Sequence, residues 1–414
     1  MNYLITIKKI TLRVLLAIII AVALLTVVYS IPVDRMDDNI TSSAVIIGDE
    51  GVYPSLFSWC TSTLDNFTDS VMLLHAGYKG EHPPIFEAMK VHRGFISYSL
   101  PNDTLVNHYL NGQDFSYADS YARYWHGYLV FLKPLLVFTD ISGIRIINTV
   151  WQILLTVFLV FAMCRANLKE YILPYLISLF FIMPLALFKS MMFSNCFNVF
   201  TLSSLAIILN HQYSCNESAD SYIFLYTGIA TAFFDLLSYP QTTFGIPLIF
   251  SLLLSEEKTS AKQFLLATKN GIYWLSGYSL MWIGKWISST IITGENGFIR
   301  AVDGMLDNAS HDPIPAMLYG NIRDFLYTPV SIVAIIFVSL MIINICRSKK
   351  KLFDSEKLIL LLASLLPFCC YFVLQHHSFV HHFFTNKELM VSSFAILAYL
   401  SSIAFKNENE QTVQ

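Results

Sequence analysis

Long apolar stretches separated by short polar connections recur along the chain from residue 11 to residue 405. The hydrocarbon layer of a membrane is about 30 Å thick, so a helix needs about 20 apolar residues to cross it. The stretches have this length or approach it. They predict an all-α, polytopic membrane protein with about ten transmembrane helices, at residues 1–31, 143–164, 171–190, 192–209, 221–235, 239–254, 268–291, 327–346, 357–374 and 388–405.

Polar and mixed segments divide this pattern into regions. Residues 32–122 are polar and rich in histidine and proline, which predicts one large loop after the first span. Residues 123–142 begin with an apolar, aromatic stretch too short for a span; because Tyr and Trp favour the headgroup layer, we predict an interfacial helix and a connection. A helix bundle at 143–405 then follows, with loops at 292–326 and 376–387 and a polar tail at 406–414.

Lysine and arginine residues indicate how the chain is oriented. The residues that flank the predicted spans on one side are Lys8, Lys9, Arg165, Lys169, Lys258, Lys262, Arg347, Lys349, Lys350, Lys351 and Lys406. Cytoplasmic flanks carry an excess of such residues, so both termini are predicted to be cytoplasmic. The large loop and the loops at 292–326 and 376–387 are then on the outer face of the cell's inner or plasma membrane.

Composition agrees with a membrane protein and excludes some functions. Hydrophobic residues make up 55% of the chain and charged residues 13%, about half the usual charged share of a soluble domain. The formal net charge of −3 gives no basic excess that would bind nucleic acid. Because Cys60 is the only cysteine of the large loop, a disulfide framework within that loop is excluded. The chain also lacks a Walker loop and a nucleophile elbow.

Two pairs of aspartates are candidate catalytic acids or bases. Asp37 and Asp38 directly follow the first span, where a carboxylate can act as a general base or a metal ligand at the membrane surface; a solvated helix end is the alternative. Asp65 and Asp69 are four residues apart, so on a helix they would share one face and their negative charges would repel each other. A bound proton, metal ion or polar substrate would remove this repulsion. The alternative is a helix start capped by Asp65 or Thr68.

Two groups of cationic and aromatic residues are candidates for binding a lipid phosphate. Arg123, Trp125 and His126 lie at the start of the predicted interfacial helix. At headgroup depth a guanidinium can bind the phosphate of a lipid carrier and an aromatic ring can stack on a sugar; membrane anchoring is the alternative. Lys285 lies in an otherwise uncharged run at 271–294, and a span-centre lysine costs about 2.5–3.5 kcal/mol. It is expected to be a counter-ion for lipid phosphate or a partner of an outer-loop aspartate, unless it snorkels to the surface.

The predicted turn at 376–387 is rich in histidine. It contains His376, His377, His381, His382 and Lys387. For His381, His382 and Lys387 we expect polar or phosphate contacts, with a transition-metal site as the alternative. No cofactor is required by the sequence; if Mg²⁺ or Mn²⁺ assists the reaction, its oxygen ligands are expected among Asp37, Asp38 and Asp65.

The layout resembles the C-type (GT-C) integral membrane glycosyltransferases, which use polyprenyl-phosphate-linked sugars. The resemblance rests on a first span leading into a long outer loop, then on residues 124–128 (Tyr-Trp-His-Gly-Tyr), 133–136 (Lys-Pro-Leu-Leu), 142–148 with a Gly-X-Arg element, and 235–240. The Leu-Asp-Asn-X-Thr-Asp, Arg-Tyr-Trp-His-Gly-Tyr and Gly-Lys-Trp elements are also similar to uncharacterised bacterial membrane proteins of surface-polysaccharide loci. The acidic signature after the first span is only approximated, by residues 34–38.

The resemblance implies an inverting hexosyl or pentosyl transfer on the outer face. A glycan or lipid-linked acceptor would attack the donor sugar, Asp65 or Asp38 would take the proton, and Arg123, Lys285, His381 or Lys387 would bind the departing lipid phosphate. One alternative is a polymerase or ligase of lipid-linked glycans, which the acidic loop at 292–326 disfavours. Another is a transporter or flippase without catalysis, for which the sequence shows no internal duplication.

Overall fold

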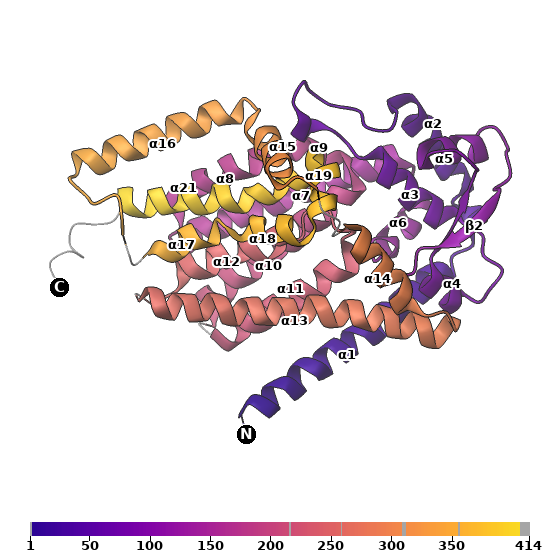
Figure 1. Cartoon of the computed structure of the whole chain (residues 1–414), viewed down its shortest axis with the longest axis horizontal. Helices are drawn as coiled ribbons and strands as arrows, with labels where there is room; N and C mark the ends of the chain where they lie inside the picture. The colour runs from indigo at the N-terminus through magenta and orange to yellow at the C-terminus, as the bar shows by residue number, and fades with distance from the viewer. Residues whose placement is uncertain (1, 215–216, 258, 309–311, 355–356, 406–414) are drawn as a thin grey trace.

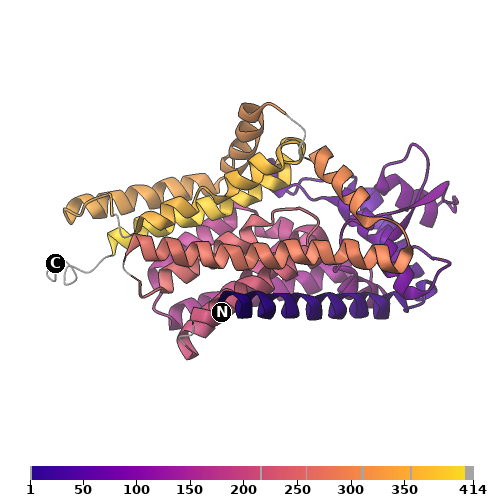
Figure 2. The ribbon, with the colours of Figure 1, turned by 60° about the horizontal axis from the view of Figure 1, so that its bottom comes forward.

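The computed structural model describes residues 2–405 except 215–216, 258, 309–311 and 355–356. Lys258 and the predicted cytoplasmic tail, with Lys406, therefore lie outside the described residues. The described chain is almost entirely helical, as predicted. The long helices lie roughly parallel, and the short elements of residues 32–122, here called the polar segment, gather at one end (Figures 1 and 2). The C-terminal ends of α16 and α21 lie at the opposite end (Figure 1).

Five helices of the described chain are long and apolar enough to cross a membrane. They are Ile5–Tyr29 within α1 (Asn2–Tyr29), α7 (Ile141–Arg165), α10 (Met191–Tyr213), α16 (Val330–Arg347), and the stretch His382–Ala404, which ends in α21 (Met390–Ala404). Each coincides with a predicted span. Many large apolar side chains of α1, α7 and α16 are exposed on the protein surface, as expected for side chains that face lipid, whereas α10 and the stretch His382–Ala404 are mostly buried inside the protein.

The other predicted spans coincide with helices that are broken, shorter or more polar. They are α8 (Ile172–Phe181) with α9 (Pro184–Lys189), α11 (Glu217–Phe234), α12 (Gln241–Leu254), α13 (Ser260–Thr293), and α17 (Leu358–Ala363) with α18 (Leu366–Val373). The break between α8 and α9 has a local cause: Met183 precedes Pro184 and adopts a left-handed φ of 57°. The number of ten spans stays a prediction.

The polar segment is folded rather than extended. Its elements are η1 (Val33–Arg35), α2 (Asp37–Glu50), η2 (Cys60–Ser62), α3 (Asn66–Gly77), α4 (Pro84–Lys90), β1 (His92–Phe95), α5 (Pro101–Tyr109) and β2 (Tyr117–Ser120). Helices α4 and α5 each begin with proline, whose missing N–H and fixed φ suit the first helical position. Strands β1 and β2 pair antiparallel, with His92 opposite Ser120 and Phe95 opposite Tyr117.

The helix predicted to be interfacial is shorter than expected: one side of it is buried, while Phe131 is 61% exposed. Helix α6 spans Leu129–Leu136 and packs against α1 and α3. Arg123, Trp125 and His126 precede it in a turn, because His126 has a left-handed φ of 57° that no helix accommodates. The helix that contains Pro134 therefore supports the polar segment with its buried side, and its interfacial position stays a prediction.

The loops predicted at 292–326 and 376–387 are also helical. The described elements there are α14 (Gly297–Asn308), α15 (Ile314–Leu326), α19 (Gln375–Val380), α20 (His382–Thr385) and η5 (Asn386–Leu389); a further short turn, η3 (Lys169–Tyr171), precedes α8. The expected tight histidine turn is thus a pair of short helices that pack against α15. This packing brings residues about 60 positions apart in sequence into contact.

Helices α11 and α13 approach so closely that only glycine fits between them. A Cβ atom at Gly277 of α13 would lie 2.2 Å from the carbonyl oxygen of Leu225, and one at Gly228 of α11 would lie 2.1 Å from that of Trp274. Both clashes are with backbone atoms, which cannot move aside as a side chain can. Small residues at such contacts are typical of helix pairs in membranes.

We predict that Gly277→Ala destabilises the protein by about 1–3 kcal/mol, because the added methyl group forces α11 and α13 apart. Gly271→Ala is the matched control in the same helix, since its Cβ would meet only the Phe244 ring, at 3.3 Å. The control should be neutral or slightly stabilising because alanine favours helix over glycine. Thermal unfolding in detergent measures both, and equal unfolding temperatures would contradict the close approach.

Candidate functional site

A single turn of the polar segment, η2, lies against the helix bundle and covers a buried lysine. This turn packs against α9, α15 and α20. Below it, Lys387 is fully buried; its Nζ donates a hydrogen bond to the Thr61 carbonyl at 3.2 Å and lies 4.6 Å from the centre of the Phe193 ring. Within the described chain this is its one hydrogen bond, although an ammonium has three donors.

Asp65, just after η2, is the nearby carboxylate. It caps the start of α3, where its side chain accepts hydrogen bonds from the Thr68 backbone N–H at 3.0 Å and the Thr68 hydroxyl at 2.7 Å. The alternative interpretation, a helix start capped by Asp65, is therefore confirmed. Burial raises the pKa of Asp65, while the Thr68 hydrogen bonds and the positive charge of Lys387 act in the opposite direction. A carboxylate and a cation from distant parts of the chain thus share this site, which we call the Asp65–Lys387 site.

Asp69, one helical turn further on, has a different environment. It is fully buried and accepts hydrogen bonds from the backbone N–H groups of Met191 and Met192, both at 3.3 Å, at the start of α10. Burial raises the pKa of Asp69 to about 7, against the lowering effects of Arg145 and of these N–H groups. Asp69 therefore joins the polar segment to the bundle.

A partly buried ion pair holds the same region together. The guanidinium of Arg145, at the start of α7, donates to both carboxylate oxygens of Glu50, at 2.6 and 2.9 Å, and to the Asn66 side-chain oxygen at 3.2 Å. Its Nε donates to the carbonyl of Lys189 at 2.8 Å. Sequence reasoning did not single out Glu50 or Asn66, since one acid at a helix end has no distinguishing pattern.

A third group of residues involves the histidines. Asp324 of α15, 2% exposed, lies 2.5 Å from His382 Nδ1 and accepts hydrogen bonds from Arg323 Nε at 2.7 Å and from the Cys60 thiol. Burial alone would raise the pKa of Asp324, but these donors lower it. Burial and Asp324 raise the pKa of the Cys60 thiol to about 12. His382 was a predicted candidate, but Cys60 and Asp324 are too distant from it in sequence to be linked to it.

The other histidines also have local partners. His376 Nδ1 lies 2.6 Å from an oxygen of Asp312, and His377 Nε2 lies 2.8 Å from the Leu237 carbonyl. His381 packs against the ring of Phe384, and burial lowers its pKa to about 4. Its predicted contact with phosphate stays a prediction.

Lys285 is buried as predicted, but its hydrogen bonds go to the backbone. It is fully buried, and its Nζ donates to the carbonyls of Met89 at 2.9 Å and Ala88 at 3.4 Å, at the end of α4. It also lies 5.6 Å from the Trp125 ring, whose N–H donates to the Met281 carbonyl at 2.8 Å. The expected aspartate partner is replaced by helix-terminal carbonyls, which have no partner within their own helix.

Arg123 and His126 lie near Lys285 in the turn before α6. The Arg123 guanidinium donates to the Tyr121 hydroxyl at 3.1 Å and stacks 5.1 Å from the Tyr124 ring. His126 is fully buried, with Nε2 2.9 Å from the Tyr121 carbonyl and Nδ1 3.0 Å from the Tyr128 hydroxyl. Burial lowers the pKa of His126 to about 3, so the imidazole is neutral near pH 7.

Asp37 and Asp38 lie in the first turn of α2, half-exposed and exposed respectively. Burial and the negative charges of Asp34 and Asp38 raise the pKa of Asp37. Among the described residues, neither carboxylate forms an ion pair with Lys285, Lys387 or Arg123. Asp65 forms no ion pair within the described chain either, but it lies within electrostatic range of Lys387 in the bundle, whose positive charge acts to lower the pKa of Asp65.

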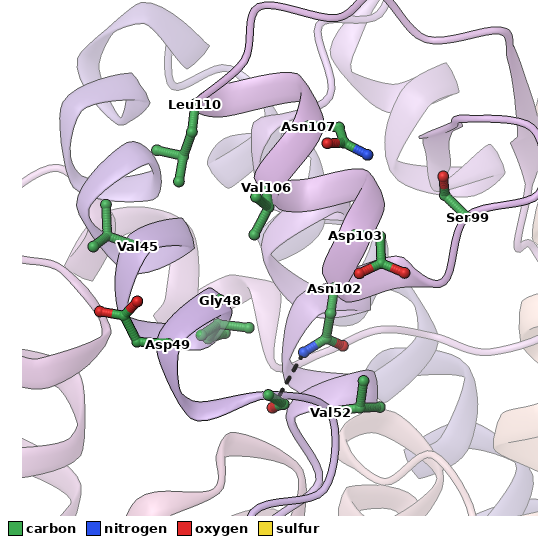
Figure 3. A pocket seen from close by; sticks show the side chains of 12 residues that line it. Val45, Gly48, Asp49, Val52, Ser99, Asn102, Asp103, Val106, Asn107 and Leu110 are labelled. Carbon is green, nitrogen blue, oxygen red and sulfur yellow. Dashed lines mark hydrogen bonds between the residues drawn. The ribbon is translucent and has the colours of Figure 1, made fainter.

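A groove of about 460 Å³ lies between α2 and α5 (Figure 3). It is lined by Val45, Ile47, Gly48, Asp49, Gly51, Val52, Ser99, Asn102, Asp103, Val106, Asn107 and Leu110. Its carboxylates and amides are hydrogen-bonding groups beside apolar side chains, and its volume suits a small ligand. The Asn102 amide is held by a 3.4 Å hydrogen bond to the Gly51 carbonyl.

Comparison with known proteins assigns no family. Scans against protein-family models, curated proteins and solved structures each found no match.

We predict that Asp69 makes the stability of the protein fall as the pH rises. Its pKa is about 7 in the folded protein against an ordinary value near 4, so its contribution is favourable below pH 4 and is lost between pH 4 and pH 7. Asp69→Asn does not titrate. The unfolding temperature of Asp69→Asn relative to wild type should therefore rise from pH 5 to pH 8, measured by thermal unfolding in detergent.

Asp114→Asn makes the same chemical change at an exposed position and is the control for this measurement. A difference between Asp69→Asn and wild type that is constant over the pH range, or that falls, would show that Asp69 is charged throughout.

Proposed function

We propose that this chain is a membrane glycosyltransferase that moves a sugar from a polyprenyl-phosphate donor to a glycan or lipid-linked acceptor. In this proposal the chain crosses the membrane ten times in a GT-C-like arrangement, and the polar segment lies on the outer face. The cationic ends of the predicted spans support the orientation: the C-terminal end of α16, with Arg347, lies opposite the polar segment (Figure 1).

The observation that carries the proposal is the Asp65–Lys387 site. Asp65 and Lys387 are both buried, within electrostatic range of each other, and each has hydrogen-bonding capacity that its described partners do not use. A substrate with a hydroxyl group and a phosphate could use both. The hydroxyl group would donate a hydrogen bond to Asp65, and the phosphate would accept one from Lys387.

These two residues supply the chemistry of an inverting transfer. The acceptor hydroxyl oxygen forms a bond to the anomeric carbon while the bond from that carbon to the phosphate oxygen breaks. The hydroxyl proton passes to Asp65, whose raised pKa brings it nearer the working pH of a general base. The bonding electrons leave with the lipid phosphate, where Lys387 stabilises the developing negative charge. The groove between α2 and α5 offers polar groups for a glycan acceptor.

A transporter is the second candidate, and the structure adds support for it. Besides Lys285, the fully buried charged residues of the bundle include Lys387 and Glu388, whose Oε1 accepts a hydrogen bond from the Gln241 N–H at 3.1 Å. Ionisable side chains inside a membrane bundle often mark a transport pathway. A transporter would move the lipid-linked sugar without breaking its glycosidic bond.

We predict that purified protein transfers sugar from at least one polyprenyl-phosphate donor to cell-envelope lipid acceptors, and that Asp65→Asn lowers kcat by about 10²- to 10⁴-fold. Lys387→Met should lower kcat by about 10²- to 10³-fold, because the leaving phosphate loses a donor. The measurement is release of polyprenyl phosphate together with product mass.

Asp114→Asn and Lys262→Met change the same residue types at exposed positions and should keep full activity. Full turnover by Asp65→Asn would reject the proposed base. Movement of intact donor across vesicles, with no sugar transferred from any donor of the panel, would favour the transporter.

A further inference from the structure

Three side chains with metal-ligating atoms meet where the polar segment contacts the bundle. The Cys60 sulfur, a carboxylate oxygen of Asp324 and a ring nitrogen of His382 all lie within 4.8 Å of one another. They come from three separate elements, η2, α15 and α20, so the cluster does not arise from sequence adjacency. Asp324 is almost fully buried, whereas His382 is 37% exposed on its side chain, which leaves a path for a small ion.

The chemistry of this set is specific. A thiolate, an imidazole and a carboxylate together suit zinc, whereas Mg²⁺ and Ca²⁺ prefer oxygen ligands alone. We propose that Cys60, Asp324 and His382 bind one zinc ion and leave its fourth coordination position for a small ligand such as water. This site differs from the Mg²⁺ or Mn²⁺ site expected at Asp37, Asp38 and Asp65, and it does not depend on the proposed sugar transfer.

The distances are compatible with zinc after small movements. Zinc–ligand bonds of about 2.0–2.3 Å in a tetrahedral arrangement place ligand atoms about 3.4–3.6 Å apart. His382 Nδ1 and Asp324 Oδ2 are now 2.5 Å apart, so these side chains need to separate by about 1 Å. The second oxygen of Asp324, Oδ1, is held by Arg323 at 2.6 Å, which leaves Oδ2 for the ion. On binding, the Cys60 thiol releases its proton to solvent and the thiolate bonds the metal.

Two buried polar side chains beside these residues give independent support for a ligand. Asn386 is fully buried, and neither atom of its side-chain amide has a hydrogen-bond partner among the described residues. The buried hydroxyl of Thr61 also lacks a partner there. Thr61 directly follows Cys60, and Asn386 follows His382 by four residues, while η5, which contains Asn386, packs against α15. Such groups are suited to hydrogen-bond a water on zinc, as second-sphere residues do.

The test is metal binding by the purified full chain, first stripped with a chelator and then equilibrated with zinc or with cobalt as a spectroscopic probe. Wild type should bind one zinc ion per chain by elemental analysis, and cobalt should give a thiolate charge-transfer band. Cys60→Ser and His382→Ala should weaken zinc binding by about 100-fold or more and abolish the band. Cys346→Ser and His376→Ala are matched controls and should bind like wild type.

Thermal unfolding separates loss of the site from loss of the fold. Zinc should raise the unfolding temperature of wild type and of both controls, but not that of Cys60→Ser or His382→Ala. Without zinc, Cys60→Ser and Cys346→Ser should unfold near the wild-type temperature, whereas His382→Ala should start lower because the buried Asp324 loses a hydrogen-bond partner, so the shift on adding zinc is compared within each variant. Wild type that binds no zinc, or Cys60→Ser that binds it as tightly as wild type, would overturn the proposal. None of these readouts measures sugar transfer, so this result and that of the transferase assay are independent.

Discussion

The ion pair between Arg145 and Glu50 is the contact on which the arrangement of the polar segment depends. Arg145 begins α7, Glu50 ends α2, and Asn66 begins α3, so one guanidinium group joins three elements. A buried guanidinium that lost its carboxylate would leave an uncompensated charge, which is strongly destabilising. The pair therefore specifies where α2 and α3 sit over the bundle, and Asp65 at the start of α3 is placed with them.

The polar segment consists of short helices, and this explains how the buried charges are accommodated. Every helix end has backbone groups without partners inside the helix, and in a segment of short helices these groups are numerous. Buried cations lie at helix C-terminal carbonyls: Lys285 at α4, Lys133 at Ala76 in α3, and Arg145 at Lys189 in α9. The buried carboxylate of Asp69 lies at the N-terminus of α10. Both placements also match the helix dipole.

Because the buried charged side chains pair with backbone groups, some features of the structure could be predicted from sequence and others could not. Apolar periodicity is local, so the long apolar helices and the burial of Lys285 could be anticipated, and the cap at Asp65 was one of two alternatives. The short helices and strands within residues 32–122, 292–326 and 376–387 were not anticipated, because these segments were predicted as loops. The partners could not be anticipated either, because the carbonyls that receive Lys285 lie about 200 positions away, and those carbonyls belong to residues of no distinctive type. Cys60 and Asp324 were missed for the same reason: each is unremarkable until tertiary packing brings it to His382.

The contrast between Lys285 and Lys387 separates structural lysines from functional candidates. Both are fully buried and both lie near an aromatic ring, so burial alone does not distinguish them. Lys285 has two carbonyl acceptors, which satisfy most of its hydrogen-bonding capacity in a position where no anion is needed. Lys387 has one described acceptor and lies within electrostatic range of Asp65, whose side-chain hydrogen bonds in the described chain both come from Thr68. A site with an unsatisfied donor and an acceptor of opposite charge is better suited to a polar ligand than to structural support.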